Sequence, residues 1–219
     1  MINSISMKNG FILFFALTSS LFGQHILPLR ERAKLIEEIQ KERIEKLLPQ
    51  LMQEEEIDLW VLITREYNED PVVKTLLPPT WLNARRRTIL VISKTQTGMD
   101  AVAITRYNFG NNIRSIWNKE KEPDQWKALA NYIESQNPKR IGVNTSVHYG
   151  LADGLAKTDY DGMMNVLPSR LQKKVVSAET LAVRWLETRT PREMILFSQL
   201  TEITHTIIEE AFSTQVITP

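Results

Sequence analysis

Two carboxylates lie four residues apart in the segment 65–71, which reads Arg-Glu-Tyr-Asn-Glu-Asp-Pro and directly follows an apolar stretch. Glu66 and Asp70 form the kind of acidic pair that general acid–base hydrolysis requires. The end of a buried strand is also a usual place for ligand contacts in an α/β sheet. The alternative is a solvated loop whose acidic side chains pair with the arginines at 85–87. Between a solvated loop and a catalytic pair, the pattern favours the solvated loop. Between a solvated loop and a loop that faces a ligand or an interface, it favours the second.

The three consecutive arginines at 85–87 precede a second apolar stretch. Alternate side chains of a strand point to opposite faces, so we expect one or two of these arginines to pair with the acidic loop. A phosphate or nucleic-acid patch is the other interpretation. The chain has 27 basic and 26 acidic residues, a net charge of +1, which gives no bulk attraction to nucleic acid. We therefore predict no nucleic-acid partner.

A third group, Glu202-x-x-His205 with Glu209, places two carboxylates and an imidazole on one side of a predicted helix. The Glu-x-x-His spacing occurs in di-iron bundles, but those need a second copy on another helix, and the sequence has none. With 3 histidines and no cysteine, a transition-metal site is hard to assemble. We expect this group to be a solvated or interface face of the helix.

The elements that position these residues alternate between helices and strands. Apolar residues at helical spacing predict the helices, Pro49 is expected to kink or split the first of them, and Gly98 is expected in a hairpin turn. The order predicts a three-layer α/β fold on a mixed β-sheet. The predicted elements are helix 29–56, strands 59–63, 88–92, 101–107 and 113–117, helix 123–136, strand 141–143, one or two helices within 156–173, strand 175–176 and helix 180–187.

The last predicted helix has a strong start signal. Thr190 is placed as N-cap, Pro191 as the first helical residue and Glu193 as its third, which together make a capping box. A helix with an apolar side needs a surface to pack on, so we expect it to connect to a second domain that holds the chemistry. The apolar residues assigned to that side are Met194, Ile195, Ile203, Ile207, Ile208, Ala211 and Phe212.

The amino terminus predicts export. A lysine at position 8 precedes the apolar run 11–17, and small and polar residues follow up to Gly23, the layout of a cleaved secretory signal peptide. The run is too short to span a bilayer. We therefore expect residues 1–23 to be removed, leaving a periplasmic or extracellular product with no membrane attachment; a buried terminal helix or strand is the alternative.

Several segments together resemble the amino-terminal domain of the Xaa-Pro aminopeptidases and their creatinase and prolidase relatives, above all the exported bacterial members. The strings R-E-Y-N-E-D-P and W-L-E-T-R-T-P are the more specific parts of this resemblance, which covers about residues 28–219. The segments are Leu59–Pro71, Ala84–Ile92, Lys139–Ser146, Asp153–Leu155 and Val176–Glu193.

The resemblance implies a two-domain protein. Residues 28–187 would form a ribonuclease-H-like amino-terminal domain without catalytic residues, and residues 190–213 a connecting helix. The carboxy-terminal "pita-bread" domain of such enzymes holds two divalent metal ions, often manganese, on two Asp, one His and two Glu, and these ions activate the water that hydrolyses the bond before proline. None of the five ligands is assigned to a position in this chain, so we expect no catalytic residue, metal or cofactor in it.

In similar enzymes the amino-terminal domain mediates oligomer contacts and shapes substrate access. The partners implied are the chain's own catalytic domain, subunits of a homo-oligomer and short proline-containing peptides. Trp81, expected to be exposed beside Pro78, Pro79 and the arginines, could meet a peptide's apolar side chain while the arginines meet its carboxylate. The residues to which we carry this role over are Arg65, Glu66, Tyr67, Asn68, Asp70, Trp81 and Arg85.

Two alternatives remain open at this point. A stand-alone exported binding or oligomerisation module would cover the helix at 191–213 or pair it with its copy, whereas the aminopeptidase domain would leave its apolar side bare. A complete small hydrolase would instead place Glu66 and Asp70 in a deep pocket, with a raised carboxylate pKa.

Overall fold

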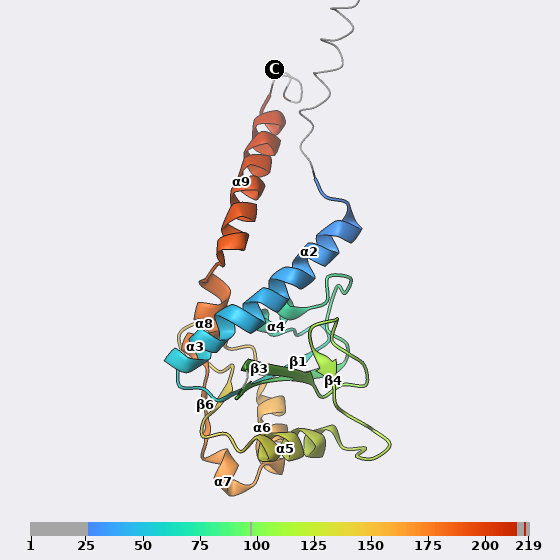
Figure 1. The fold of residues 1–219 in the computed structure, drawn as a ribbon, viewed down its shortest axis with the longest axis vertical. Coiled ribbons are helices and arrows are strands. Elements are labelled where there is room, and N and C mark those ends of the chain that lie inside the picture. Colours follow the sequence, from blue (N-terminus) through green and yellow to red (C-terminus); the bar gives the residue numbers. More distant parts are fainter. Residues whose placement is uncertain (1–25, 97, 214–216, 218–219) are drawn as a thin grey trace, which may run out of the picture.

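The chain folds around a mixed β-sheet that carries helices on both faces (Figure 1). The computed structural model describes residues 26–96, 98–213 and 217, and the predicted signal peptide lies outside them. In this part of the chain the sheet has 6 strands in the order β4-β3-β2-β1-β5-β6. β2 pairs antiparallel with both β1 and β3, and the remaining neighbours are parallel, so the predicted mixed α/β fold is confirmed. The strands are β1 (Leu59–Arg65), β2 (Arg87–Thr95), β3 (Gly98–Ala103), β4 (Arg114–Ser115), β5 (Ile141–Val143) and β6 (Val175–Ser177).

The helices form one layer on each side of the sheet. α3, α4 and α8 pack on one face and α5, α6 and α7 on the other, as Figure 1 shows above and below the strands. The helices are α2 (Leu29–Glu42), the π-helical η2 (Arg43–Leu47), α3 (Leu48–Glu54), α4 (Pro71–Leu76), α5 (Gln125–Gln136), the 3-10 helix η3 (Gly150–Ala152), α6 (Lys157–Val166), α7 (Ser169–Gln172), α8 (Glu179–Glu187) and α9 (Pro191–Ala211).

β1 shows why a continuous apolar run marks the centre of this sheet. Trp60 and Leu62 contribute to the core beneath α3 and α8, whereas Leu59, Val61 and Ile63 contribute to the core beneath α5. Side chains alternate between the two faces, and a strand covered on both must be apolar at every position. The predicted buried strand at 59–63 is therefore confirmed.

The first predicted helix is divided, but not by a simple kink. It consists of α2, a π-helical segment and α3, with Pro49 in the first turn of α3. Proline has no N–H to donate to Glu45, four residues back, and its ring crowds that carbonyl. The backbone N–H of Leu48 instead donates to the carbonyl of Arg43, five residues back, which widens the helix just before the proline.

The hairpin between β2 and β3 is present, but its boundaries differ from the prediction. β3 begins at Gly98, which pairs with Thr95 of β2 instead of occupying the turn. Its φ of 146° is a backbone conformation that glycine adopts more readily than other residues. β3 ends at Ala103 instead of continuing to residue 107, and the strand predicted at 113–117 has only the two residues of β4. The shortened β3 leaves residues 104–107 as loop at this edge of the sheet.

α9 begins as predicted. The Thr190 hydroxyl accepts the N–H of Glu193 (3.3 Å), and the Glu193 carboxylate accepts the N–H of Thr190 (2.8 Å), so the capping box is complete. Pro191 occupies the first helical turn, where its missing N–H costs nothing. The local sequence therefore specifies where this helix starts.

Replacing Thr190 with Ala is expected to destabilise the first turn of α9 by about 1 kcal/mol, the usual cost of a lost N-cap. Amide exchange in that turn should accelerate roughly fivefold. Thr201→Ala is the matched control, because Thr201 lies in the middle of α9 and is exposed. Equal exchange rates in the two variants would contradict a stabilising cap.

Candidate functional site

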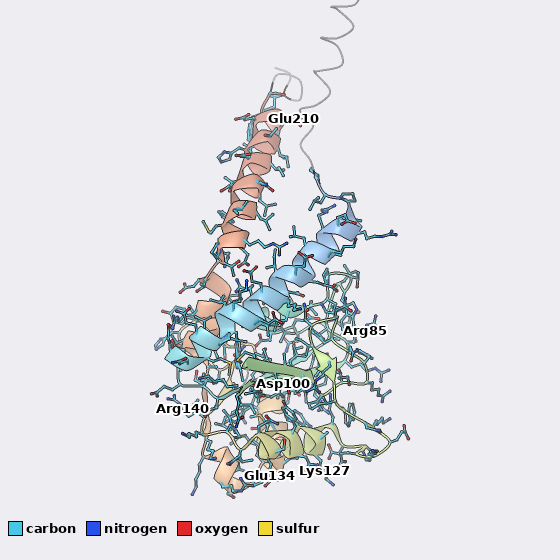
Figure 2. The ribbon with its side chains drawn as sticks, viewed as in Figure 1. Arg85, Asp100, Lys127, Glu134, Arg140 and Glu210 are labelled. Carbon is cyan, nitrogen blue, oxygen red and sulfur yellow. The ribbon has the colours of Figure 1, made fainter. Side chains whose placement is uncertain are left out.

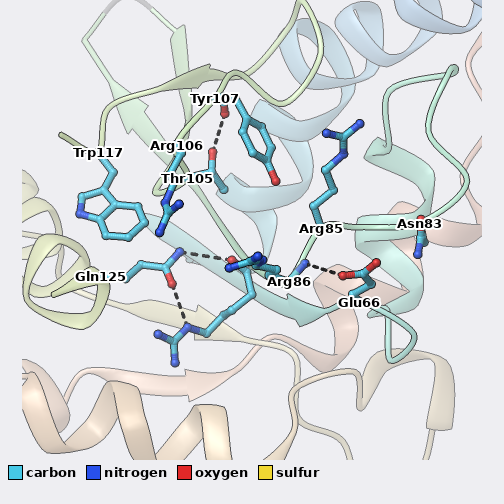
Figure 3. A pocket seen from close by; sticks show the side chains of 10 residues that line it. Glu66, Asn83, Arg85, Arg86, Thr105, Arg106, Tyr107, Trp117 and Gln125 are labelled. Carbon is cyan, nitrogen blue, oxygen red and sulfur yellow. Dashed lines mark hydrogen bonds between the residues drawn. The ribbon is translucent and has the colours of Figure 1, made fainter. Parts of the chain in front are cut away.

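An open pocket of about 620 Å³ lies where β1 ends and β2 begins (Figure 3). Arg65 and Arg87 are the last pair of the β1–β2 register at this edge. The loop after β3 reaches the same edge, because the N–H of Ile104 donates to the carbonyl of Ile89 (2.8 Å). The pocket is lined by Glu66, Asn83, Arg85, Arg86, Arg87, Thr105, Arg106, Tyr107, Trp117 and Gln125.

Glu66 and Arg86 join the two sides of the pocket rim through the backbone. The N–H of Glu66 donates to the carbonyl of Arg86 (2.8 Å), and the N–H of Arg86 donates to the Glu66 carboxylate (3.2 Å). Arg86 has a φ of 50°, a left-handed conformation that is uncommon outside glycine and is held here by these two bonds. The arginine triplet therefore does not alternate across a strand as expected, since only Arg87 belongs to β2.

Arg87 and Gln125 line the pocket and contact each other. The guanidinium of Arg87 lies 4.2 Å from the centre of the Trp126 ring, and its Nε donates to the amide oxygen of Gln125 (2.9 Å). Gln125 is buried and donates in turn to the carbonyl of Ile104 (2.6 Å). Burial lowers the pKa of Arg87, because the charged guanidinium loses water at this site. Arg87 is thus a cation held in place by an aromatic ring and by a neutral hydrogen-bond partner.

Arg85 lies on the opposite side of the pocket among aromatic rings. Its guanidinium is 4.8 Å from the Trp81 ring centre and 5.6 Å from that of Tyr107. Trp81 also packs edge-on against Tyr107 and Phe109. The expectation of an exposed Trp81 is corrected here: the ring is half-buried, packs on the core and holds Arg85 in place, and Trp81 is not among the residues that line the pocket.

The ion pairs of the acidic loop also differ from the expectation. Arg65 donates two hydrogen bonds, of 2.7 and 2.8 Å, to the buried carboxylate of Asp159 in α6. Glu69 accepts the backbone N–H groups of Tyr67 and Ala84. The predicted pairing of the loop with the side chains at 85–87 is wrong, because the loop uses backbone donors and its own arginine turns to another helix.

Tyr67 and Asn68 form a tight turn directly after β1. The N–H of Asn68 donates to the carbonyl of Arg65 (3.0 Å), and Tyr67 has a φ of 67°. The Tyr67 side chain is 85% exposed, and Asn68 is exposed as well. The structure therefore leaves both residues on the surface beside the pocket, and their role in substrate access stays a prediction.

Asp70, assigned to a substrate cleft, is instead a buried structural residue with 1% of its surface exposed. One carboxylate oxygen accepts the N–H groups of Val72 (2.8 Å) and Val73 (3.2 Å) and so caps α4. The other accepts from the Asn144 amide (2.9 Å), whose oxygen accepts the indole N–H of Trp60 (2.8 Å). Asp70 thus connects α4 to Trp60 of β1 and to the residue that follows β5.

Glu66 and Asp70 do not form an acid–base pair. Burial raises the pKa of Asp70, outweighing the donors that stabilise its ionised form. The raised pKa matches the hydrolase hypothesis, but in the described part of the chain Glu66 lines the open pocket whereas Asp70 is buried outside it. A Cβ at Gly154 would overlap the Asp70 carboxylate, so this carboxylate is enclosed by backbone.

Several pocket residues were not identified from the sequence. Arg106, Trp117 and Gln125 come from three separate segments and meet only because the loop after β3 and the start of α5 converge on this edge. In Figure 3 they lie on one side of the pocket, with Glu66 and Arg85 on the other. Arg106 and Trp117 are placed inside predicted strands, so the sequence carried no signal that they would meet at this pocket.

The group on α9 lies away from this pocket. Glu202, His205 and Glu209 are exposed, as expected for a solvated or interface face. Among the described residues, no group of 3 or more histidine and acidic side chains is placed to hold a metal ion. None of the helices in the same part of the chain has the length and apolarity needed to cross a bilayer.

The chain matches no protein-family model and no curated protein sequence. Its fold is similar to that of a solved Xaa-Pro dipeptidase from Bacillus anthracis, with a TM-score of 0.45 and 13% sequence identity. The similarity covers 71% of this chain and 37% of the dipeptidase, so the chain corresponds to little more than a third of that protein's length.

Proposed function

We propose that this chain is the non-catalytic amino-terminal domain of an exported Xaa-Pro aminopeptidase-like metallopeptidase of the creatinase and prolidase group, with a ribonuclease-H-like architecture. The two most specific strings of the resemblance support this, because each has a defined place in the fold. R-E-Y-N-E-D-P forms the turn after β1 and the cap of α4. W-L-E-T-R-T-P forms the end of α8 and the capped start of α9.

The observation that carries the proposal is that α9 is anchored at its start and bare along its length. The helix has 21 residues, and none of them is buried. In Figures 1 and 2 it extends away from the sheet layers, and beyond its first turn its side chains stand clear of the α/β body. Several large apolar side chains of this helix and its C-cap are between 49 and 76% exposed. They are Met194, Ile195, Phe197, Leu200, Ile207, Ile208 and Phe212.

An apolar surface of this extent is typical of an interaction site. We assign it to the catalytic domain that the resemblance implies, in which two divalent metal ions would be bound. The α/β domain would then contribute subunit contacts and shape the access of proline-containing peptides. The loop residues Tyr67 and Asn68, together with Glu66 and Arg85 of the pocket, are the surface groups placed to serve that role.

The same bare helix favours one alternative, a stand-alone exported module in which two copies pair through α9. The test is the mass of the native protein isolated from its source cells with an antibody against this chain. The proposal expects a polypeptide that continues beyond α9 by a domain and cleaves Xaa-Pro peptides with Mn²⁺. A native product that ends with α9 and forms dimers would overturn the proposal in favour of the module.

The isolated 219-residue chain is expected to show no turnover of Xaa-Pro dipeptides, with or without added Mn²⁺. The physical reason is that such hydrolysis requires a metal-activated water, and the ligands for the metal ions are assigned to the other domain. Release of the N-terminal residue can be followed by chromatography of the reaction mixture. Turnover stimulated by Mn²⁺ would contradict the non-catalytic assignment.

A further inference from the structure

We infer that the pocket between β1 and the loop after β3 binds a small ligand through its carboxylate or phosphate oxygens. This inference goes beyond the proposed function and does not depend on it. It rests on the charge, the shape and the partners of the residues around the pocket (Figure 3).

The side chains that line the pocket carry an excess of positive charge, which Asp159 and Asp124, outside the lining, offset in part at Arg87. Four arginines line it, together with a single carboxylate, that of Glu66. This carboxylate accepts the backbone N–H of Arg86. No pocket arginine forms an ion pair with a described residue, whereas many arginines elsewhere do. Those ion-paired arginines are Arg43, Arg65, Arg114, Arg140, Arg170, Arg184 and Arg192.

The pocket arginines are held in place by contacts that leave most of their side-chain donors available, although Arg87 uses its Nε on Gln125. Arg85 and Arg87 lie against aromatic rings, which bind a guanidinium without using up its N–H groups. The side chains of Arg86 and Arg106 are exposed and form no hydrogen bond with any described side chain or backbone group. The positive charges gathered at this site repel one another. An anion bound among them therefore gains more electrostatic free energy than it would beside an isolated arginine.

The shape fits a small organic anion. A volume of about 620 Å³ lies in the range of roughly 300–1,000 Å³ that is usual for small-molecule sites. Tyr107 and Trp117 give apolar walls on which the carbon skeleton of a ligand could lie. Guanidinium groups bind carboxylate and phosphate alike, in a bidentate geometry, so the shared chemistry is that of an oxyanion.

The experiment is isothermal titration of the purified chain with pyrophosphate and, separately, with citrate, at pH 7 and 0.15 M ionic strength. We expect saturable 1:1 binding of at least one probe. Arg86→Gln and Arg106→Gln should each weaken that binding about tenfold, the effect of one lost charge-assisted contact. Glu66→Gln should tighten it several-fold, because it removes the one repelling carboxylate. The tighter probe distinguishes a phosphate ligand from a carboxylate ligand.

The control is Arg32→Gln, which removes the same charge from an exposed position of α2, outside the pocket. It should leave the dissociation constant unchanged. No saturable binding of either probe, or an equal loss in the Arg32, Arg86 and Arg106 variants, would overturn the inference. Thermal melts confirm that each variant is folded. The outcome of this titration leaves the proposed function untouched, because that proposal is tested by the mass of the native protein.

Discussion

Replacing Asp70 with Ala is expected to lower the free energy of unfolding by about 3 kcal/mol. Roughly 1 kcal/mol comes from the lost cap of α4. About 2 kcal/mol comes from the Asn144 amide, which is left buried without an acceptor. Urea denaturation followed by tryptophan fluorescence measures the change, since the buried Trp60 belongs to the same network.

An exchange of the two side chains separates the hydrogen bonds from simple packing. Asp70→Asn alone places an amide N–H opposite the amide of Asn144, and Asn144→Asp alone places two carboxylates together. In the double variant Asp70→Asn/Asn144→Asp, the amide at position 70 donates to the carboxylate at position 144, the reverse of the native bond, and that carboxylate still accepts from the Trp60 indole. We expect both single variants to lose about 2 kcal/mol or more and the double variant to recover most of the loss. Additive losses would contradict the network.

Replacing Arg43 with Met is the second change expected to have a large effect, about 3 kcal/mol, because it removes one partner of a buried ion pair. Arg43 donates to both carboxylate oxygens of Glu193 (3.0 and 2.8 Å) and to the carbonyls of Thr188 (2.8 Å) and Trp185. Its guanidinium also lies 4.3 Å from the Trp185 ring centre. One side chain of η2 thus joins the end of α8 to the first turn of α9.

The matched control is Arg192→Met, which breaks an exposed ion pair with Glu38. Exposed pairs contribute about 0–1 kcal/mol, so the control should change stability little. Hydrogen exchange should locate the effect of Arg43→Met in the first turn of α9, where the capping box loses the cation that orients Glu193. Equal losses in the two variants would show that Arg43 does not anchor the helix.

The sequence alone determined the features that depend on neighbouring residues. The capping box at 190–193, the strand at 59–63 and the end of α5 at Asn137, which has a φ of 45°, all follow from residues close to one another along the chain. The mixed α/β fold followed from the order of such elements. These predictions succeed because helix caps, turns and strand periodicity are set by local backbone geometry and by which faces are apolar.

The partners of the charged residues were decided only by the tertiary structure. Arg65 and Asp159 are 94 residues apart, Asp70 and Asn144 are 74 apart, and Arg43 and Glu193 are 150 apart. A charged side chain gains nearly as much from water as from many protein partners, so its type does not specify which partner it finds. The order of the strands brings these groups together, and it also leaves four arginines around one pocket with a single carboxylate among them.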